Sequence, residues 1–230
     1  EGHLSLVAAA KQQCDRVIVT IFVNPTQFNN TEDLTLYPRT EAADAALLAS
    51  HAVDVIFAPA PEDVYPQGFS SQVTVAGVAD TLEGRFRPGH FAGVATVVAK
   101  LFGMTLSDKA YFGEKDWQQV QVIARMTADL NLNVALQICA TARASDGMAL
   151  SSRNARLSSA DRAIAGQLHP VMRACAQDLI QGQATAQIVA KAQKALIGYG
   201  FEKIDYFTYC DGQSLVSLDH FVPNGRLLVA

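Results

Sequence analysis

The sequence predicts an α/β fold, with a doubly wound parallel sheet followed by a smaller α+β region. Apolar runs typical of buried strands alternate with helical patterns over residues 1–141. After Arg153 the pattern changes, and long Ala-rich helical stretches precede two short strands. The chain has 230 residues, half of them hydrophobic, which is enough for one large or two modest domains.

The first predicted domain, residues 1–141, alternates helix and strand along its length. We expect helices over residues 3–13, 40–50, 90–102 and 115–130, and strands over residues 16–23, 53–58, 72–76, 109–112 and 134–140. Strands separated by helices pair in parallel, because a crossover helix returns the chain to the end of the sheet at which the previous strand began. The pattern therefore predicts a Rossmann-like sheet.

The second predicted domain covers residues 142–230, with its boundary between Thr141 and Ser151. Ser158 and Asp161 form a capping-box pattern at the start of a long Ala-rich helix. We expect a second helix over residues 185–197 and strands over 204–210 and 226–229. These elements predict a smaller α+β domain.

Composition and charge exclude several classes of protein. The formal net charge of −4 and the pI near 5.7 argue against a nucleic-acid partner, so local cations must meet any anionic substrate. The four cysteines lie far apart in sequence and indicate neither a zinc site nor a disulfide framework. The apolar run 94–106 is short for a membrane span and contains Lys100, and no basic leader precedes it, so we expect a cytoplasmic protein without a membrane partner.

Three segments carry side chains suited to a polyphosphate. Residues 146–154 read DGMALSSRN and set two hydroxyls beside a guanidinium, residues 112–119 read FGEKDWQQ, and Glu1-Gly2-His3 opens a helical pattern. Arginine offers planar paired donors, lysine a point charge, and a helix N-terminus free N–H groups. Together the three segments predict a nucleotide site.

Five motifs, in order and at about the same spacing, resemble the pantothenate synthetase (pantoate:beta-alanine ligase) family. They are residues 21–28 (IFVNPTQF), 37–40 (YPRT), 87–91 (RPGHF), 112–119 and 146–154. The resemblance implies membership of the nucleotidyltransferase superfamily, whose members carry a His-x-x-His motif after the first strand. Glu1-Gly2-His3 resembles the tail of that motif, so we expect a strand and a histidine before Glu1 and further residues after Ala230.

The resemblance implies a nucleotide-binding set drawn from both domains. Catalytic roles fall to His3, Lys115, Ser151, Ser152 and Arg153, and the ATP-binding set adds Gly2, Gly113 and Asp116. Asp44 is expected to help hold the metal, with a solvated carboxylate on a helix face as the alternative. An exposed first-turn residue is the alternative for His3, and a polar hinge loop is the alternative for the serines and Arg153.

The resemblance also implies a substrate-binding set, which comprises Asn24, Gln27, Gln119, Tyr37, Arg87 and His90. Asn24 and Gln27 follow an apolar strand, and open parallel sheets bind ligands at the carboxyl ends of their strands. Lys115 and Gln119 are four residues apart and would share one face of a helix. For Tyr37 and Arg39 an ordinary turn remains the alternative, and for Arg87 and His90 helix capping.

The reaction implied is ATP-dependent condensation of pantoate with beta-alanine through a pantoyl adenylate, releasing AMP and pyrophosphate, on the pathway to coenzyme A. It would use ATP and Mg²⁺, with the smaller domain as a lid and a homodimer as the assembly. Two alternatives stay open: another nucleotidyltransferase of the same motif type, and an inactive fragment that keeps only the dimer surface. Pantoate-dependent ATP–pyrophosphate exchange separates them.

Overall fold

The computed structural model describes residues 2–27, 35 and 41–230. The chain divides into two compact units, each with its own core. The first comprises Glu1–Asp80 and Arg87–Thr141, and the second comprises Thr81–Phe86 and Ala142–Ala230. The segment Thr81–Phe86 thus belongs to the second unit, although a boundary drawn along the sequence assigns it to the first.

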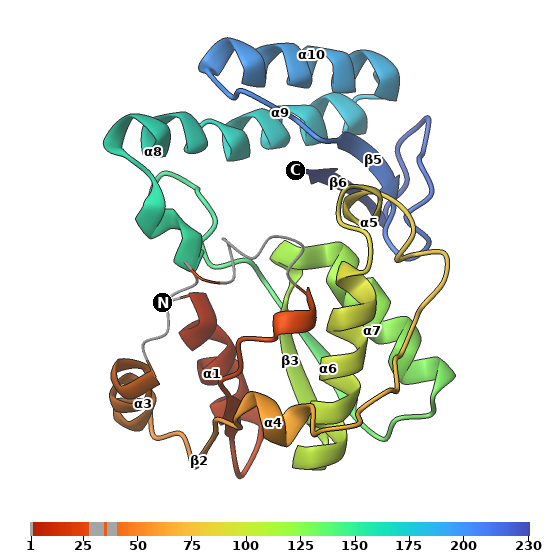
Figure 1. The fold of residues 1–230 in the computed structure, drawn as a ribbon. Coiled ribbons are helices and arrows are strands. Elements are labelled where there is room, and N and C mark those ends of the chain that lie inside the picture. The colour runs from red at the N-terminus through yellow and green to blue at the C-terminus, as the bar shows by residue number, and fades with distance from the viewer. Residues whose placement is uncertain (1, 28–34, 36–40) are drawn as a thin grey trace. The chain divides into compact units, whose positions relative to one another are not determined.

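The first unit alternates helix and strand (Figure 1). Its elements in order are α1 (Gly2–Gln13), β1 (Ile18–Thr20), the 3-10 turn η1 (Pro25–Gln27), α3 (Glu41–Ser50), β2 (Val55–Phe57), α4 (Pro61–Val64), α6 (His90–Thr105), β3 (Lys109–Gly113), the 3-10 turn η2 (Glu114–Asp116), α7 (Trp117–Asp129) and β4 (Ala135–Cys139).

The strands of this unit pair in parallel, as the alternation predicts. β1 pairs with β2 from Ile18↔Val55 to Thr20↔Phe57, and β3 pairs with β4 from Lys109↔Ala135 to Gly113↔Cys139. Helix α3 lies between the first two strands in sequence and α7 between the second two, which is the crossover that parallel strands require. In the described part of the chain these are two separate two-stranded ladders.

Two predicted elements of the first unit are wrong in detail. Residues 72–76 are not a strand: the Val73 N–H donates to the Thr96 Oγ1 at 2.9 Å, and Val75 is buried against the helices. Their β-branched alternation therefore reflects packing on a helix and not a ladder. The helix expected from residue 115 begins at Trp117, because Asp116 has φ −96° and ψ 59°, outside the helical region.

Helices α6 and α7 pack together around the core of the first unit (Figure 1). The buried residues of this core are Val75, Phe91, Val94, Ala95, Val122, Ile123 and Met126. Burial of each large apolar side chain of this kind contributes about 1.5 to 3 kcal/mol. The core therefore fixes the N-terminal end of α6, from which His90 and Gly93 project toward η1.

Asp54 ties the start of β1 to the start of β2. Its carboxylate accepts the Val17 backbone N–H at 2.9 Å, Arg16 Nη1 at 2.9 Å and Lys11 Nζ at 3.0 Å. These donors, with the backbone N–H the largest influence, hold the pKa of Asp54 well below its usual range. One side chain thereby joins α1 to both strands.

The second unit contains α5 (Glu83–Phe86), the 3-10 turn η3 (Ser152–Arg156), α8 (Ser159–Ala165), α9 (Leu168–Ile180), α10 (Thr185–Tyr199), β5 (Phe207–Asp211) and β6 (Gly225–Val229). β5 and β6 are antiparallel, and α9 and α10 pack side by side (Figure 1). The Ser158 Oγ accepts the Asp161 N–H, which confirms the predicted cap. The single long helix expected there is divided into α8 and α9.

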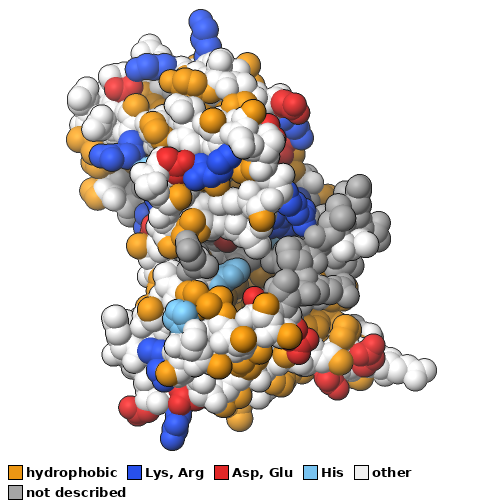
Figure 2. Space-filling model, turned by 90° about the vertical axis from the view of Figure 1, so that its left-hand side faces the viewer, with side chains coloured by type: hydrophobic (Ala, Val, Ile, Leu, Met, Phe, Trp, Pro, Cys, Tyr) orange, Lys and Arg blue, Asp and Glu red, His pale blue; other side chains and the backbone are white. Residues whose placement is uncertain are grey.

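None of the helices described combines the length and the apolar character that crossing a membrane requires. On the face drawn in Figure 2, basic and acidic side chains are interspersed. Such a surface agrees with the small formal net charge of −4.

Candidate active site

Asn24 is the centre of a buried hydrogen-bond network after β1. Only 2% of its surface is exposed. Its Nδ2 donates to the Gln27 Oε1 at 3.2 Å and to the Gly93 carbonyl at 3.2 Å, which uses both amide hydrogens. Its Oδ1 accepts the Tyr65 hydroxyl at 2.7 Å and the Thr26 Oγ1 at 3.0 Å. The Asn24 side chain is therefore fully satisfied within the protein.

The backbone of Gln27 is held by the start of α6. The His90 Nδ1 donates to the Gln27 carbonyl at 2.8 Å, and the Arg87 Nη2 donates to the same oxygen at 3.3 Å. His90 is buried, with its ring centroid 4.9 Å from that of Phe91. Both side chains lie at η1, so the structure brings Arg87, His90, Asn24 and Gln27 into one cluster, and His90 orients Gln27 through its main chain.

Gly93 allows α6 to approach η1 closely. A Cβ at this position would lie 2.5 Å from the Thr26 carbonyl oxygen and 2.8 Å from its carbonyl carbon. Any side chain here would therefore push the turn away from the helix. The sequence singled out neither Gly93 nor Thr26, because a glycine inside a helical pattern signals close packing only when its neighbour is known.

Tyr65 closes the other side of this turn. Its ring lies 6.2 Å from Phe22 and 5.2 Å from Phe69, centroid to centroid, while its hydroxyl reaches Asn24. Burial raises the pKa of Tyr65 above its usual value, so the hydroxyl stays protonated and remains a donor. No signal in the sequence assigned Tyr65 a role.

Lys115 and Asp116 lie in η2, directly after β3. The Lys115 Nζ contacts the Asp116 Oδ1 at 3.0 Å, and both side chains are substantially exposed, 42% and 58%. An exposed pair of this kind adds little stability, so both groups can exchange partners for a ligand. Gly113 ends β3 and precedes the turn.

The neighbouring amides differ in what they contact. Gln118 is buried and its Nε2 donates to the Val78 carbonyl at 2.8 Å, whereas Gln119 is half-buried on the first turn of α7. Lys115 and Gln119 do not lie on one continuous α-helix, because the 3-10 turn intervenes. The prediction that Lys115 and Gln119 share one face of a helix is therefore wrong.

His3 and Gly2 form the first turn of α1, where His3 is exposed. Asp44 lies in the first turn of α3 and is half-buried. Within the part of the chain that the structure describes, no three His, Cys, Asp or Glu side chains lie close enough together to hold a metal ion. Tyr37 and Arg39 fall outside the described residues.

Ser151, Ser152 and Arg153 lie in the second unit, at the start of η3. Ser151 is its N-cap, and the Ser151 Oγ accepts the Arg153 N–H at 3.3 Å. The Asn154 Nδ2 donates to the Ala149 carbonyl at 3.0 Å and holds the turn against the preceding loop. The Arg153 side chain is exposed, while its backbone is held in place by the Ser151 cap.

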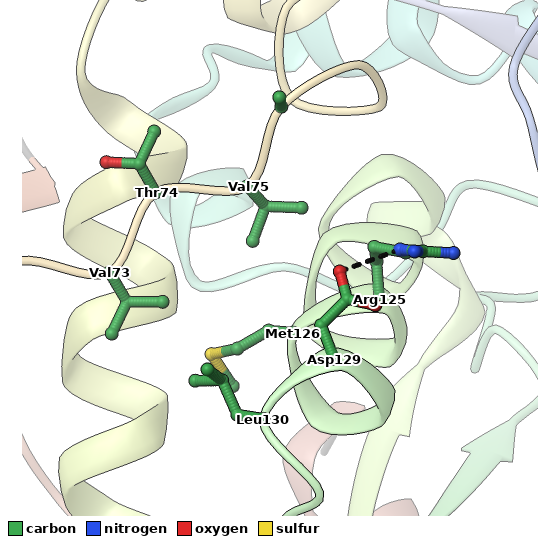
Figure 3. A pocket seen from close by; sticks show the side chains of 8 residues that line it. Val73, Thr74, Val75, Arg125, Met126, Asp129 and Leu130 are labelled. Atoms are coloured by element: carbon green, nitrogen blue, oxygen red, sulfur yellow. Dashed lines mark hydrogen bonds and ion pairs between the residues drawn. The ribbon is translucent and has the colours of Figure 1, made fainter.

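Two cavities lie outside the predicted site. One, of about 370 Å³, lies between the segment 73–76 and α7. Its charged groups, Arg125 and Asp129, pair with each other at 2.8 Å, and Val75, Met126 and Leu130 lie beside them (Figure 3). The other, of about 510 Å³, lies in the second unit beside α9.

The parallel crossovers and the polar turns that follow β1 and β3 define an α/β protein of the nucleotidyltransferase fold class. The chain belongs to the pantoate-beta-alanine ligase family, whose model matches residues 1–230. Members of this family condense pantoate with beta-alanine with the use of ATP, so the chain is an ATP-dependent ligase of pantothenate biosynthesis.

Curated relatives carry the same assignment. The chain is 56% identical over 230 residues to the pantothenate synthetase of Cereibacter sphaeroides, covering all of this chain and 82% of that protein. It is 54% identical to the pantothenate synthetase of Ruegeria pomeroyi, over 100% of this chain and 81% of the relative.

Solved structures share the fold. The crystal structure of pantothenate synthetase from Thermus thermophilus matches with a TM-score of 0.95 at 41% identity, covering 99% of this chain and 83% of that one. The pantoate-beta-alanine ligase from Francisella tularensis, complexed with beta-gamma ATP and beta-alanine, matches with a TM-score of 0.80 at 39% identity. That match covers 90% of this chain and 76% of the other. The α/β fold class predicted from the sequence is confirmed.

Proposed function

We propose that the chain activates pantoate as an acyl adenylate. A pantoate carboxylate oxygen attacks the α-phosphorus of ATP, the bond from that phosphorus to the β-phosphate bridging oxygen breaks, and pyrophosphate leaves. The amine of beta-alanine then attacks the acyl carbon, AMP leaves, and the nitrogen loses a proton. No protein nucleophile is needed, so catalysis rests on positioning and on cations near developing charge.

The observation that carries this proposal is the network around Asn24. Because the Asn24 amide occupies the Gln27 Oε1, the Gln27 Nε2 is left with two N–H donors for a ligand. Two donors from one planar amide suit the carboxylate and hydroxyl oxygens of pantoate. We therefore assign Gln27 to direct contact, with Gln119 as its partner, and Asn24, Arg87 and His90 to positioning.

Lys115 would meet the phosphates of ATP. Its present partner, Asp116, is exposed, so transfer of the ammonium from that carboxylate to a polyphosphate costs little. Gly113 would allow the nucleotide to approach the backbone, and Asp116 would orient the ribose or a metal. Gly2, His3, Ser151, Ser152 and Arg153 would complete the phosphate contacts, and Tyr37 would add to the pantoate pocket.

Mg²⁺ would arrive with ATP, because this ion keeps several waters and binds mainly through phosphates and one or two carboxylates. The carboxylates present fit that mode, with Asp44 and Asp116 as the groups that would contribute. The ion would supply neutralisation of phosphate charge. We also propose that residues 142–230 act as a lid that protects the adenylate from water.

The assembly and the compartment are part of the same proposal. We propose a homodimer, to be tested by light scattering coupled to size-exclusion chromatography. We propose a cytoplasmic location, in agreement with the free thiols of Cys14, Cys139, Cys175 and Cys210 among the described residues.

Pantoate-dependent exchange of labelled pyrophosphate into ATP tests the first half-reaction without beta-alanine. We expect exchange with pantoate and none with a phosphorylated acceptor in its place. Exchange that does not need pantoate would contradict the proposed order of steps. Absence of exchange despite a cooperative melting transition would indicate a chain that folds without adenylating pantoate.

A further inference from the structure

The cavity beside α9 in the second unit is lined by side chains to which the proposed ligase site gives no role. It has a volume of about 510 Å³. One wall is the loop Ala144, Ser145, Asp146 and Gly147, and the other is one face of α9, with His169, Pro170, Arg173, Ala174 and Gln177. His169, Arg173 and Gln177 are spaced by four residues, so the helix aligns an imidazole, a guanidinium and an amide along the cavity.

The charge around this cavity is positive. Arg143 lies behind the loop, where its Nη1 donates to the Gly147 carbonyl at 3.0 Å. Arg173 is exposed and forms no ion pair with a carboxylate that the structure describes. This concentration of arginine stands out in a chain whose formal net charge is −4.

The one acidic group in the cavity lining, Asp146, is already neutralised. Its Oδ1 accepts the Met148 N–H at 3.0 Å, and its Oδ2 accepts Arg162 Nη1 of α8. The Arg162 guanidinium holds the pKa of Asp146 below its usual range. Asp146 therefore braces the loop and leaves Arg143 and Arg173 without a counter-charge from this side.

His169 contacts the loop directly. A Cβ on Gly147, which has a φ of +90°, would lie 2.5 Å from the His169 Nδ1, so the ring lies against bare backbone. Burial, followed by repulsion from Arg143 and Arg173, lowers the pKa of His169. The imidazole therefore lies where an added negative charge would favour its protonated form.

We propose that this cavity binds a multivalent phosphate anion of the pyrophosphate type, held by Arg173 and His169 from α9, with Arg143 adding positive charge from behind the loop. Guanidinium and imidazolium groups are the usual partners of phosphate oxygens, and Gln177 extends the contact along the helix. The site is separate from Ser151, Ser152 and Arg153, none of which lines the cavity.

The loop links this site to those serines. Arg143 and Ala149 form an antiparallel bridge, and the Ala144 N–H donates to the Met148 carbonyl at 2.8 Å. The Leu150 N–H donates to the Ala142 carbonyl at 2.9 Å, immediately before Ser151. An anion bound to the loop would therefore stiffen the backbone that carries Ser151.

Histidine NMR titration of the whole chain tests the site. In chloride at matched ionic strength, the pKa of His169 should lie below the usual value for histidine; added pyrophosphate should raise it by about one unit. Because proton and anion binding are reciprocal, that rise corresponds to roughly tenfold tighter binding to the protonated form. Inorganic phosphate should need a higher concentration for the same rise.

Arg173→Gln separates the site from general salt effects. Without pyrophosphate this substitution should raise the pKa of His169, because one repelling charge is gone, and pyrophosphate should then add little further shift. Arg125→Gln, at an exposed pair in the first unit, is the matched control and should leave the titration unchanged. Lys115→Ala should also preserve the shift, which distinguishes this site from the proposed ATP site.

Three results would overturn the proposal. They are equal pKa values of His169 in chloride and pyrophosphate, an undiminished pyrophosphate shift in Arg173→Gln, and equal potency of phosphate and pyrophosphate. Arg173 is exposed on α9, and a thermal melt of the variant checks that the comparison is made on folded protein.

Discussion

The backbone of Thr26 packs so closely against Gly93 that it occupies the space a side chain at position 93 would need. The Thr26 carbonyl oxygen lies 2.5 Å from the position of a Cβ on Gly93, while the Asn24 Nδ2 donates to the Gly93 carbonyl at 3.2 Å. These two contacts, at the Gly93 Cα and at its carbonyl, fix helix α6 and the turn η1 relative to each other. They set the position of Gln27, whose side-chain amide we propose binds pantoate.

Gly93→Ala should destabilise the protein and weaken pantoate binding. Alanine in place of glycine inside a helix gains about 1 kcal/mol, whereas overpacking costs about 1 to 3 kcal/mol. The overlap involves backbone, which cannot rotate away, so we expect a net loss and a displaced Gln27. Gly103→Ala is the control: it lies in the same helix with open space around it and should be neutral or stabilising. Urea unfolding and calorimetric pantoate titration of both variants measure the difference.

Lys115→Ala should lower the single-turnover rate of adenylate formation by orders of magnitude with little change in melting temperature. The exposed Lys115–Asp116 pair contributes at most about 1 kcal/mol to stability, whereas a cation on transferring phosphate stabilises developing charge. Lys191→Ala removes a pair between the exposed Lys191 and the half-buried Asp178 in the second unit and should leave the rate unchanged. A rate for Lys115→Ala close to that of the unmodified chain would remove Lys115 from the phosphate site.

Gln27→Ala and Gln119→Ala should each weaken the binding of pantoate far more than the binding of ATP. Leaving a buried ligand oxygen without its hydrogen-bond donor costs about 1 to 3 kcal/mol of binding free energy, which is roughly 5- to 150-fold in affinity. Calorimetric titration with both ligands gives the two affinities, and Gln187→Ala on the exposed face of α10 serves as the control. Equal losses for ATP and pantoate would contradict the assignment.

Asp54→Asn should destabilise the protein at neutral pH, and the difference from the unmodified chain should shrink in acid. The folded pKa of Asp54 is lowered, so its contribution is present above the unfolded value near 4 and is lost as pH falls toward the folded pKa. Urea unfolding of both proteins between pH 7 and about pH 3 follows the upper part of this window, where the decrease begins. A difference that stays constant over the whole range would show that the ionised carboxylate is not what stabilises the strands.

Periodicity alone located most elements, because apolar spacing reflects which face of a segment is buried. The helix at Gly2–Gln13 and the cap at Ser158 were predictable from local signals that need no distant partner. Residues 72–76 were not, since an alternating β-branched run packs equally well on a helix and in a ladder, and here Thr96 takes the Val73 N–H. Local sequence records burial but not the identity of the partner.

The sequence by itself determined the α/β class, the order of the motifs and the residue types that can grip phosphate and carboxylate. Only the tertiary structure decided which groups those residues contact. Asn24 reads as a substrate ligand in the sequence, yet its amide is consumed by Gln27 and by Gly93, 69 residues further along the chain. A hydrogen bond saturates its donor, so whether a polar side chain binds ligand or holds its neighbour depends on contacts that folding alone creates.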